Sequence, residues 1–285
     1  MRLSRLALVA VLAALASLSV PALAGAQQTS SGPTFPFNAS VLTKAPGISP
    51  PGANDWSCKP GRYTPEPVVL VHGTFGDMTL SWVTVAPALK LAGYCVFALD
   101  LPARATGPIA DSAAALSAFI DKVRASTGAA KVDVVGHSQG GVVPRYVVKK
   151  LGGASRIDDV VALAPSNHGT LLANLAGRLA QPFCKACAEQ AAGSAFLRDL
   201  NKSPEAPAPV HYTNITTVYD QVVVPFASGW LDGGSNVTNV TMQLRCLRNE
   251  TEHLKILFDP VALQWVLNAL GRTGPAASSF RPLCI

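Results

Sequence analysis

The stretch KVDVVGHSQGGVVPRY, residues 131–146, decides how this chain is expected to fold. Its first part is a short apolar run rich in valine, which favours a strand buried on both faces of a parallel sheet. Its last part has the apolar spacing of a helix. Only the glycine-rich residues 136–140 separate the two, so the chain must turn sharply there. We therefore predict a strand, a tight turn and a helix in direct succession.

The turn itself, GHSQG, matches the pattern G-x-S-x-G in the strand-to-helix setting that gives this pattern meaning. A serine in such a turn adopts strained dihedral angles and stands its hydroxyl clear of the sheet, which requires room two residues away on each side. Gly136 and Gly140 provide that room. The N-terminus of the following helix also favours negative charge on an attacked carbonyl. We therefore predict that Ser138 is a nucleophile; the alternative is a glycine turn with an idle serine.

A serine nucleophile needs a base within hydrogen-bond reach, and the base needs an acid that orients it. In a strand-turn-helix setting, the expected order along the chain is serine, acid, histidine. Of the five histidines, His253 alone lies far enough downstream to follow an acid placed after a strand. We predict His253 as the base, the alternative being a solvated loop histidine.

The acid is selected by its position relative to the predicted strands. Ligand sites of parallel α/β sheets lie at the carboxyl ends of the strands. Asp220 closes the predicted strand at residues 215–220, whereas Asp158 and Asp159 open a strand and belong to the opposite end of the sheet. We predict Asp220 as the acid, with Asp232 as the second candidate.

A tetrahedral intermediate needs donors for its oxyanion, usually one N–H just after the nucleophile and one from the loop after an early strand. Gln139 supplies the first donor. In VVLVHGTFGD, residues 68–77, the glycine after the strand lets Thr74 turn inward, so Thr74 is predicted as the second donor, with Phe75 as the alternative. His72 is expected to be structural, bonding within its own loop.

Short apolar runs alternate with longer amphipathic ones from residue 67 onward. The predicted strands are residues 68–73, 94–101, 131–138, 159–165, 215–220 and 239–244. The predicted helices are residues 82–93, 111–128, 140–153 and 259–271. This alternation predicts an α/β fold, with a mostly parallel, doubly wound sheet and helices on both faces.

The amino-terminal segment, residues 1–24, combines two arginines with an apolar core and a small-residue end, which is typical of a secretory signal peptide. Cleavage is expected after Ala24 or Ala26. A retained membrane anchor is the alternative, but serines and a proline interrupt the apolar run. We therefore predict a secreted protein with no transmembrane anchor after cleavage.

The rest of the chain divides into an arm and one domain. Residues 25–66 are rich in Ser, Gly, Pro and Asn and predict an extended arm. Residues 67–285 form the predicted catalytic domain. Within it, residues 166–211 break the alternation and predict an insertion, which either overhangs the site as a cap or packs on the surface.

Composition excludes some functions. The chain is 49% hydrophobic and 14% charged, with a formal net charge of +6. No run of Lys and Arg interleaves with aromatic residues, so a nucleic-acid partner is not expected.

An exported chain meets an oxidising compartment, so its cysteines are expected to pair, although spacing alone leaves the connectivity open. CKAC, residues 184–187, could instead be half of a zinc site or a redox motif, but no second such pair exists. No metal is therefore predicted. The six cysteines are Cys58, Cys95, Cys184, Cys187, Cys246 and Cys284.

Several motifs taken in order, namely HGTFG, GHSQGG followed by VPRYVVKKLGG, LAPSNHGT, and YDQVVVP with a late histidine, resemble the secreted actinobacterial lipases of the lipase class 2 family over roughly residues 40–285. Parts also resemble the fungal lipase B of the same hydrolase superfamily. In that lipase, a threonine after an early glycine and the glutamine after the nucleophile form the oxyanion hole, which again points to Thr74 and Gln139. The chain departs from it in its G-H-S elbow and its insertion.

The resemblance implies an α/β-hydrolase fold, a Ser138, Asp220 and His253 triad, and hydrolysis of carboxylic esters, including acylglycerols, without metal or organic cofactor. It also implies three disulfides, which are Cys58–Cys95, Cys246–Cys284 and Cys184–Cys187.

We therefore predict a secreted serine ester hydrolase of the lipase type that acts on an ester or lipid substrate, either in solution or at a lipid–water interface. The alternatives with the same triad are a short-chain esterase, an acyltransferase and a polyester depolymerase. A non-catalytic binding protein on a hydrolase scaffold is disfavoured by the complete, ordered triad. Candidates for an acyl-chain groove, with buried packing as the favoured alternative for each residue taken singly, are Leu171, Leu172, Val222, Val223 and Phe226.

Overall fold

The computed structural model describes residues 47–174 and 183–285. These residues belong to one compact unit, Phe35–Ile285. The predicted signal peptide, residues 1–24, and the first part of the predicted arm lie outside the described residues. Within the described ranges, no helix combines the length and apolar character that a membrane crossing needs.

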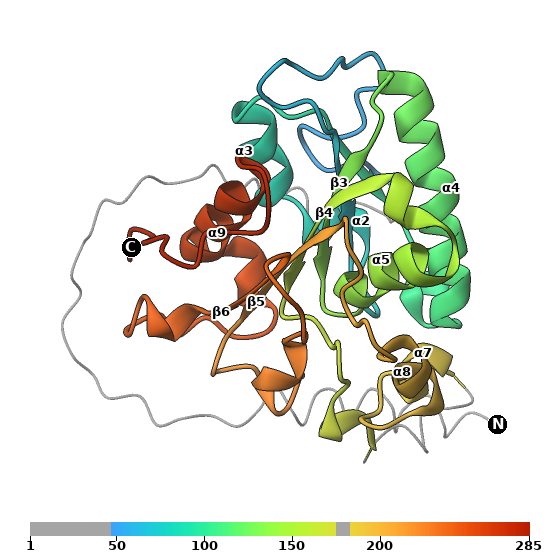
Figure 1. Ribbon diagram of the computed structural model, residues 1–285, viewed down its shortest axis with the longest axis vertical. Coiled ribbons are helices and arrows are strands. Elements are labelled where there is room, and N and C mark those ends of the chain that lie inside the picture. Colours follow the sequence, from blue (N-terminus) through green and yellow to red (C-terminus); the bar gives the residue numbers. More distant parts are fainter. Residues whose placement is uncertain (1–46, 175–182) are drawn as a thin grey trace. The chain divides into compact units, whose positions relative to one another are not determined.

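A six-stranded, fully parallel sheet forms the centre of the unit, in the order β2-β1-β3-β4-β5-β6 (Figure 1). The chain starts this sheet near one edge, crosses to that edge, and then builds the other four strands in sequence order. The strands are β1 (Val68–Val71), β2 (Val96–Leu99), β3 (Val132–His137), β4 (Ile157–Leu163), β5 (His211–Thr216) and β6 (Val237–Thr241).

Helices cover both faces of the sheet (Figure 1). The α-helices are α2 (Met78–Ser81), α3 (Val85–Leu91), α4 (Ile109–Thr127), α5 (Gln139–Lys150), α7 (Lys185–Glu189), α8 (Ala195–Leu200) and α9 (Pro260–Leu270). The short 3-10 helices are η2 (Pro102–Ala105), η3 (Gly153–Ser155), η4 (Phe226–Gly229), η5 (Met242–Leu244) and η6 (Lys255–Phe258).

The two-residue period of the strands divides the core into two layers. In β1, Val68 and Leu70 pack with α3 and α9, whereas Val69 and Val71 pack with α4 and α5. All four residues of β1 are fully buried. A strand buried on both faces has no polar side, which is why these strands read as continuous apolar runs.

The structure confirms the parallel α/β fold and corrects two boundaries. The predicted strand at residues 215–220 is β5, which begins at His211 and ends at Thr216. The polar start of β5 hid it from hydrophobic patterning, because Thr213 and Asn214 are buried but satisfied by hydrogen bonds. The predicted helix at residues 82–93 is α3, which spans Val85–Leu91. A separate short helix, α2, precedes it and is capped by Asp77.

The described part of the predicted arm packs along the edge strand β2. Asn54 exchanges hydrogen bonds with the backbone of Val96 and Ala98, at 2.9 Å in each case. The Cys58–Cys95 disulfide fixes the same segment to the start of β2.

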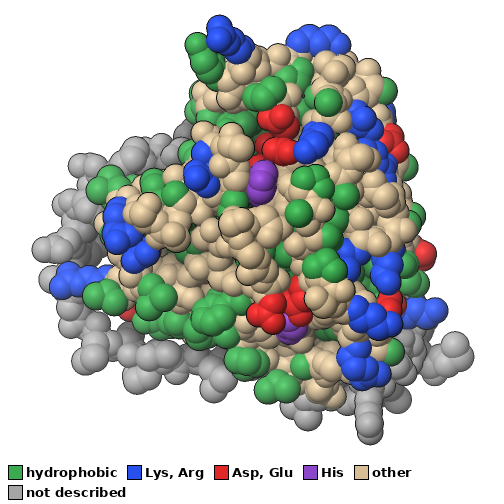
Figure 2. Space-filling model, viewed as in Figure 1, with side chains coloured by type: hydrophobic (Ala, Val, Ile, Leu, Met, Phe, Trp, Pro, Cys, Tyr) green, Lys and Arg blue, Asp and Glu red, His purple; other side chains and the backbone are tan. Residues whose placement is uncertain are grey.

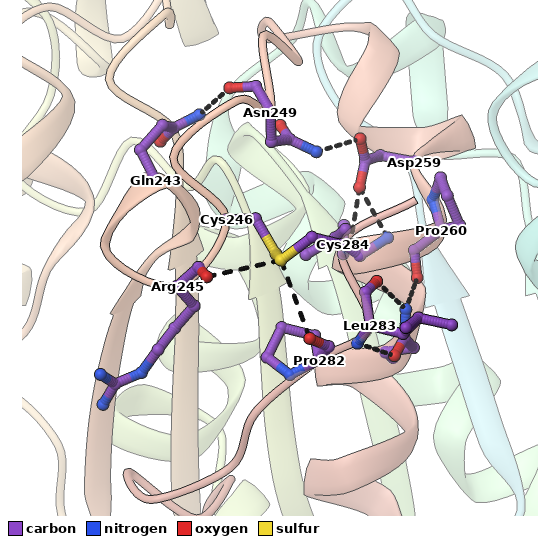
Figure 3. The surroundings of a disulfide bond; sticks show 12 residues. Gln243, Arg245, Cys246, Asn249, Asp259, Pro260, Pro282, Leu283 and Cys284 are labelled. Atoms are coloured by element: carbon purple, nitrogen blue, oxygen red, sulfur yellow. Dashed lines mark hydrogen bonds between the residues drawn. A yellow bond between two sulfur atoms is a disulfide. The ribbon is translucent and has the colours of Figure 1, made fainter.

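Two further disulfides complete the three pairs that the resemblance implied. Cys184–Cys187 closes a short loop around the start of α7. Cys246–Cys284 joins the segment after β6 to the carboxyl-terminal residues (Figure 3). Because Cys184 and Cys187 are bonded to each other, the alternative of a zinc half-site falls away.

Candidate active site

Ser138 stands at the junction of β3 and α5, as the sequence predicts. Its dihedral angles are φ 55° and ψ −124°, a conformation that a residue with a side chain rarely adopts. Its N–H donates to Leu163 O of the neighbouring strand at 2.9 Å, and its carbonyl accepts from Gly141 N at 2.9 Å. These two hydrogen bonds hold the backbone of Ser138 in its unfavourable conformation.

The two elbow glycines permit this close turn. A Cβ atom on Gly136 would overlap the carbonyl of Gly140, and one on Gly140 would overlap the carbonyl of Val71 in β1. Helix α5 therefore packs its first turn directly against two strands. This close approach explains why both positions lack side chains.

Asp220 and His253 form a buried pair at the carboxyl ends of the strands. His253 Nδ1 lies 2.9 Å from Asp220 Oδ2, and the two residues are 3% and 8% exposed. Asp220 Oδ1 accepts from the N–H groups of Val222 and Val223, at 2.9 and 2.7 Å. Asp220 does not close a strand as predicted, because it lies in the loop four residues beyond the end of β5.

The loops that carry Asp220 and His253 are fastened to each other. Gln221 Nε2 donates to Glu252 Oε2 at 2.7 Å, so the neighbours of the pair are joined. Thr217 Oγ1 donates to Thr251 O at 2.6 Å. These two hydrogen bonds therefore fix the distance between the loop that carries Asp220 and the loop that carries His253.

The far side of the His253 loop is held near the start of α9. Asn249 Nδ2 donates to Asp259 at 2.8 Å, and Gln243 Nε2 donates to Asn249 O at 3.0 Å (Figure 3). The Cys246–Cys284 disulfide lies beside these contacts. This bridge thus ties the carboxyl-terminal residues to the segment that leads into His253.

His137, the residue before Ser138, connects the elbow to His253. Its Nε2 lies 2.9 Å from His253 O, and the two rings lie 4.8 Å apart between centroids. Because a carbonyl can only accept, His137 Nε2 carries the proton. Burial, with a smaller contribution from the neighbouring His253, lowers the pKa of His137 to about 3, so this ring is neutral at neutral pH. The sequence placed His137 in the elbow but gave it no role.

The three residues of the candidate triad thus lie in one region, but only His253 and Asp220 are joined by a hydrogen bond. Among the described residues, the Ser138 hydroxyl has no hydrogen-bond partner. Catalytic hydrogen bonds often tighten only when substrate is bound. The predicted second acid, Asp232, is exposed in the loop before β6.

The loop after β1 lies directly against the elbow. A Cβ on Gly73 would lie 2.9 Å from Ser138 Cβ. The backbone N–H groups of Thr74 and Gln139 donate to no described residue, so both are free to face a ligand. Phe75 N, the alternative donor, instead donates to Arg104 O at 2.8 Å.

His72 is structural, as expected. Leu101 N donates to His72 Nε2 at 2.9 Å, which leaves the Nδ1 proton to donate to Gly73 O at 2.8 Å. Burial lowers the pKa of His72, so the neutral ring fixes the start of the loop.

The side chains of Thr74 and Gln139 meet a third residue, Gln190, which directly follows α7. Thr74 Oγ1 donates to Gln139 Oε1 at 2.6 Å. Gln190 Nε2 lies 2.9 Å from Thr74 Oγ1 and 3.3 Å from Gln139 Oε1. The insertion therefore contacts the candidate oxyanion hole through Gln190, which no sequence motif had singled out.

The predicted groove residues lie near Asp220 but differ in exposure. Leu171 N donates to Val224 O at 2.9 Å, which places the start of the insertion beside the Asp220 loop. Leu171 is exposed, and Leu172, Val222 and Phe226 are half-buried. Val223 is buried in the protein and is not available to a ligand, which corrects its assignment.

Among the described residues, one group of His and carboxylate side chains has the spacing of metal ligands. Asp158, Asp159 and His211 each bring one donor atom within 4.8 Å of the others. Lys131 Nζ lies 2.7 Å from Asp158 Oδ1 and already neutralises that carboxylate. The group also lies at the amino ends of β4 and β5, away from Ser138.

Comparisons with known proteins show the family to which the chain belongs. A family model described as "Lipase (class 2)" matches residues 65–266. A triacylglycerol lipase of Pseudomonas fragi is 30% identical over 151 residues, which cover 50% of this chain and 50% of that protein. The matches span between 24% and 50% of the length of the curated relatives.

Solved structures show the fold. Aspergillus fumigatus lipase B has a TM-score of 0.68 at 20% identity, covering 80% of this chain and 57% of that chain. An α/β hydrolase from a lagoon-sediment metagenome has a TM-score of 0.51 at 17% identity, covering 73% of this chain and 90% of that chain. The chain has the α/β-hydrolase fold, as the resemblance implied.

Proposed function

We propose that this chain, which belongs to the lipase (class 2) family, is a secreted serine hydrolase that cleaves carboxylic esters of lipids through an acyl-enzyme. One observation carries the proposal. A buried histidine–carboxylate pair lies beside a strained serine elbow, and the backbone N–H groups of Thr74 and Gln139, next to that elbow, donate to no described residue.

The histidine–carboxylate pair has the polarity that a base requires. Asp220 is a hydrogen-bond acceptor, so His253 Nδ1 carries its proton and Nε2 is left to accept one. When Ser138 attacks the ester carbonyl, His253 Nε2 takes the hydroxyl proton. Asp220, held by the N–H groups of Val222 and Val223, keeps its orientation and balances the imidazolium.

The oxyanion of the tetrahedral intermediate would be bound by the N–H groups of Thr74 and Gln139. The N-terminus of α5 adds a favourable electrostatic field at the same place. His253 then gives its proton to the leaving alcohol. Water repeats the sequence on the acyl-enzyme, which releases the acid and restores Ser138.

A lipid substrate is supported by apolar side chains around the site. Phe75, Leu171, Val224 and Leu254 are each more than a third exposed. Three of them belong to the loops that carry Thr74, Asp220 and His253, and Leu171 is hydrogen-bonded to the Asp220 loop. Figure 2 shows hydrophobic side chains gathered over the segments that follow β5 and β6. Curated relatives named triacylglycerol lipases point to the same class of substrate.

Secretion is supported by two features. The three disulfides fit an oxidising compartment, and residues 1–24 have the pattern of a signal peptide.

The test is hydrolysis of p-nitrophenyl esters from acetate to palmitate by wild type, Ser138→Ala and the control Ser155→Ala, which changes an exposed serine of η3. We expect Ser138→Ala to lose on the order of 10⁴-fold or more in kcat and the control to lose nothing. Activity that is highest on long acyl chains supports a lipase. Activity that is highest on acetate or butyrate would instead identify a short-chain esterase. Full activity of Ser138→Ala would overturn the proposal.

A further inference from the structure

Gln190 connects the insertion to both candidate oxyanion residues. It is 7% exposed and lies at the end of α7. Ser166 Oγ lies 2.8 Å from its Oε1, and Ala186 O lies 3.1 Å from its Nε2. Because Ala186 O can only accept, the amide orientation is fixed, and Nε2 is the atom that faces Thr74 and Gln139.

This orientation determines where the hydroxyl proton of Thr74 points. Gln190 Nε2 can only donate, so Thr74 Oγ1 accepts from it and gives its own proton to Gln139 Oε1. The hydroxyl is therefore turned away from any oxyanion. To help bind one, it must rotate and leave Gln139 Oε1, a side chain with no exposure to water.

Gln190 is placed to replace the bond that this rotation breaks. Its Nε2 already lies 3.3 Å from Gln139 Oε1, so a small shift gives that oxygen a full hydrogen bond. Without Gln190, the rotation would leave a buried acceptor unpaired, which is costly inside a protein.

We propose that Gln190 is a positioning residue, which holds Thr74 and Gln139 at rest and takes over Gln139 Oε1 when the Thr74 hydroxyl turns to the oxyanion. The proposal rests on the proposed ester hydrolysis at Ser138. Gln190 itself touches neither the substrate nor the reacting atoms.

The insertion holds Gln190 in place independently of any ligand. The Cys184–Cys187 disulfide encloses the first turn of α7. Ala186 N donates to Thr106 O at 3.2 Å, and Glu189 Oε2 accepts from Ile109 N, at the start of α4, at 2.7 Å. Gln190 is thus fixed by contacts to a neighbouring helix, as a preorganised donor requires.

The experiment is a double-mutant cycle on the full-length mature enzyme with a p-nitrophenyl ester. Gln190→Met keeps a similar volume but removes the donor, and Thr74→Val removes the hydroxyl. The control is Gln264→Met in α9, a glutamine with the same kind of backbone contacts at Pro260 and Leu283. Tm is measured for every variant.

We expect Gln190→Met to lower kcat about 10-fold or more with little change in KM, because the oxyanion exists only in the transition state. We expect the loss to shrink to less than about twofold in the Thr74→Val background, because Gln190 acts through that hydroxyl. The control keeps wild-type kcat.

Losses that multiply in the double variant, or an unchanged kcat in Gln190→Met, would overturn the proposal. So would a loss of kcat that tracks a fall in Tm below the assay temperature. Failure of the proposed function is separate, because it would appear as retained activity in Ser138→Ala, whatever Gln190→Met does.

Discussion

The two ends of the sheet each carry a histidine beside a buried aspartate, and only one end joins the two residues by a hydrogen bond. At the carboxyl ends, His253 Nδ1 lies 2.9 Å from Asp220, which also accepts two backbone N–H bonds. At the amino ends, His211 Nδ1 lies 3.8 Å from Asp159, and neither of these two facing atoms has a hydrogen-bond partner among the described residues.

The surroundings of the two aspartates explain the difference. Burial raises the pKa of Asp159 to about 8, and the like charges of Asp158 and Glu66 add to this. Burial also raises the pKa of Asp133, which lies beside Asp159. Asp220 instead accepts three hydrogen bonds, from the N–H groups of Val222 and Val223 and from His253. A histidine and an aspartate in proximity thus become a base only where the carboxylate is fully hydrogen-bonded and like charges are distant.

The largest predicted difference in kcat is between two variants, each of which replaces the aspartate at one end of the sheet by asparagine. Asp220→Asn removes the carboxylate that fixes the tautomer of His253, so we expect kcat to fall about 10³- to 10⁴-fold. Asp159→Asn, the matched control at the other end, should leave kcat unchanged. Steady-state kinetics on a p-nitrophenyl ester would decide, and equal losses in the two variants would erase the distinction between the two ends.

A smaller effect is expected at His137, which donates to His253 O. His137→Phe keeps a ring but removes the donor, so His253 is held less well and kcat should fall about 10-fold. His137→Gln, which restores a donor, should recover part of the loss. Because the pKa of His137 is about 3, its titration lies below the working range. The acid limb of the pH–rate profile should therefore keep its midpoint in His137→Gln, and a shifted midpoint would refute this role.

The smallest effect concerns stability at the amino ends. The folded-state pKa of Asp159 is about 8, above its usual 3.8, so the folded protein holds a proton that the unfolded chain releases between these values. Stability is therefore lost as pH rises from about 4 to 8. Asp159→Asn removes this contribution and should raise the free energy of unfolding at pH 9 by about 1 kcal/mol.

Urea unfolding at pH 5, 7 and 9 would measure this difference between Asp159→Asn and wild type. We expect the gain of the variant to grow with pH. A gain that is constant across the three values would contradict the shifted pKa. Other charged groups near Asp159 also affect how the free energy of unfolding changes with pH, in wild type and variant alike. They are Glu66, Lys131, Asp133, Asp158, His211 and Arg272.

The parts of the molecule that could be predicted are those with a local pattern. The elbow at Ser138 follows from a valine-rich strand, two glycines and a helix, all within a few residues. The boundaries of β5 were missed because its polar residues are paired inside the protein, which hydrophobic patterning cannot detect. Asp220 was selected for the right end of the sheet, although the strand stops before it.

The contacts made by His137 and Gln190 could not be predicted from a local sequence pattern. Each joins residues 116 positions apart, and each depends on which way a side chain turns in the folded protein. The histidine in GHSQG offered a hint, since it lies next to the candidate nucleophile. Nothing in the sequence around Gln190 distinguishes it from a surface glutamine of a short helix.

The most direct test of the central claim is covalent labelling with an alkyl p-nitrophenyl phosphonate, followed by peptide mass spectrometry. The phosphonate reports an activated hydroxyl, because that oxygen displaces p-nitrophenolate and stays bonded to phosphorus. We predict one adduct per chain, on Ser138, forming much more slowly in His253→Ala. An adduct on a different residue, or labelling of Ser138 at the same rate without His253, would contradict the account.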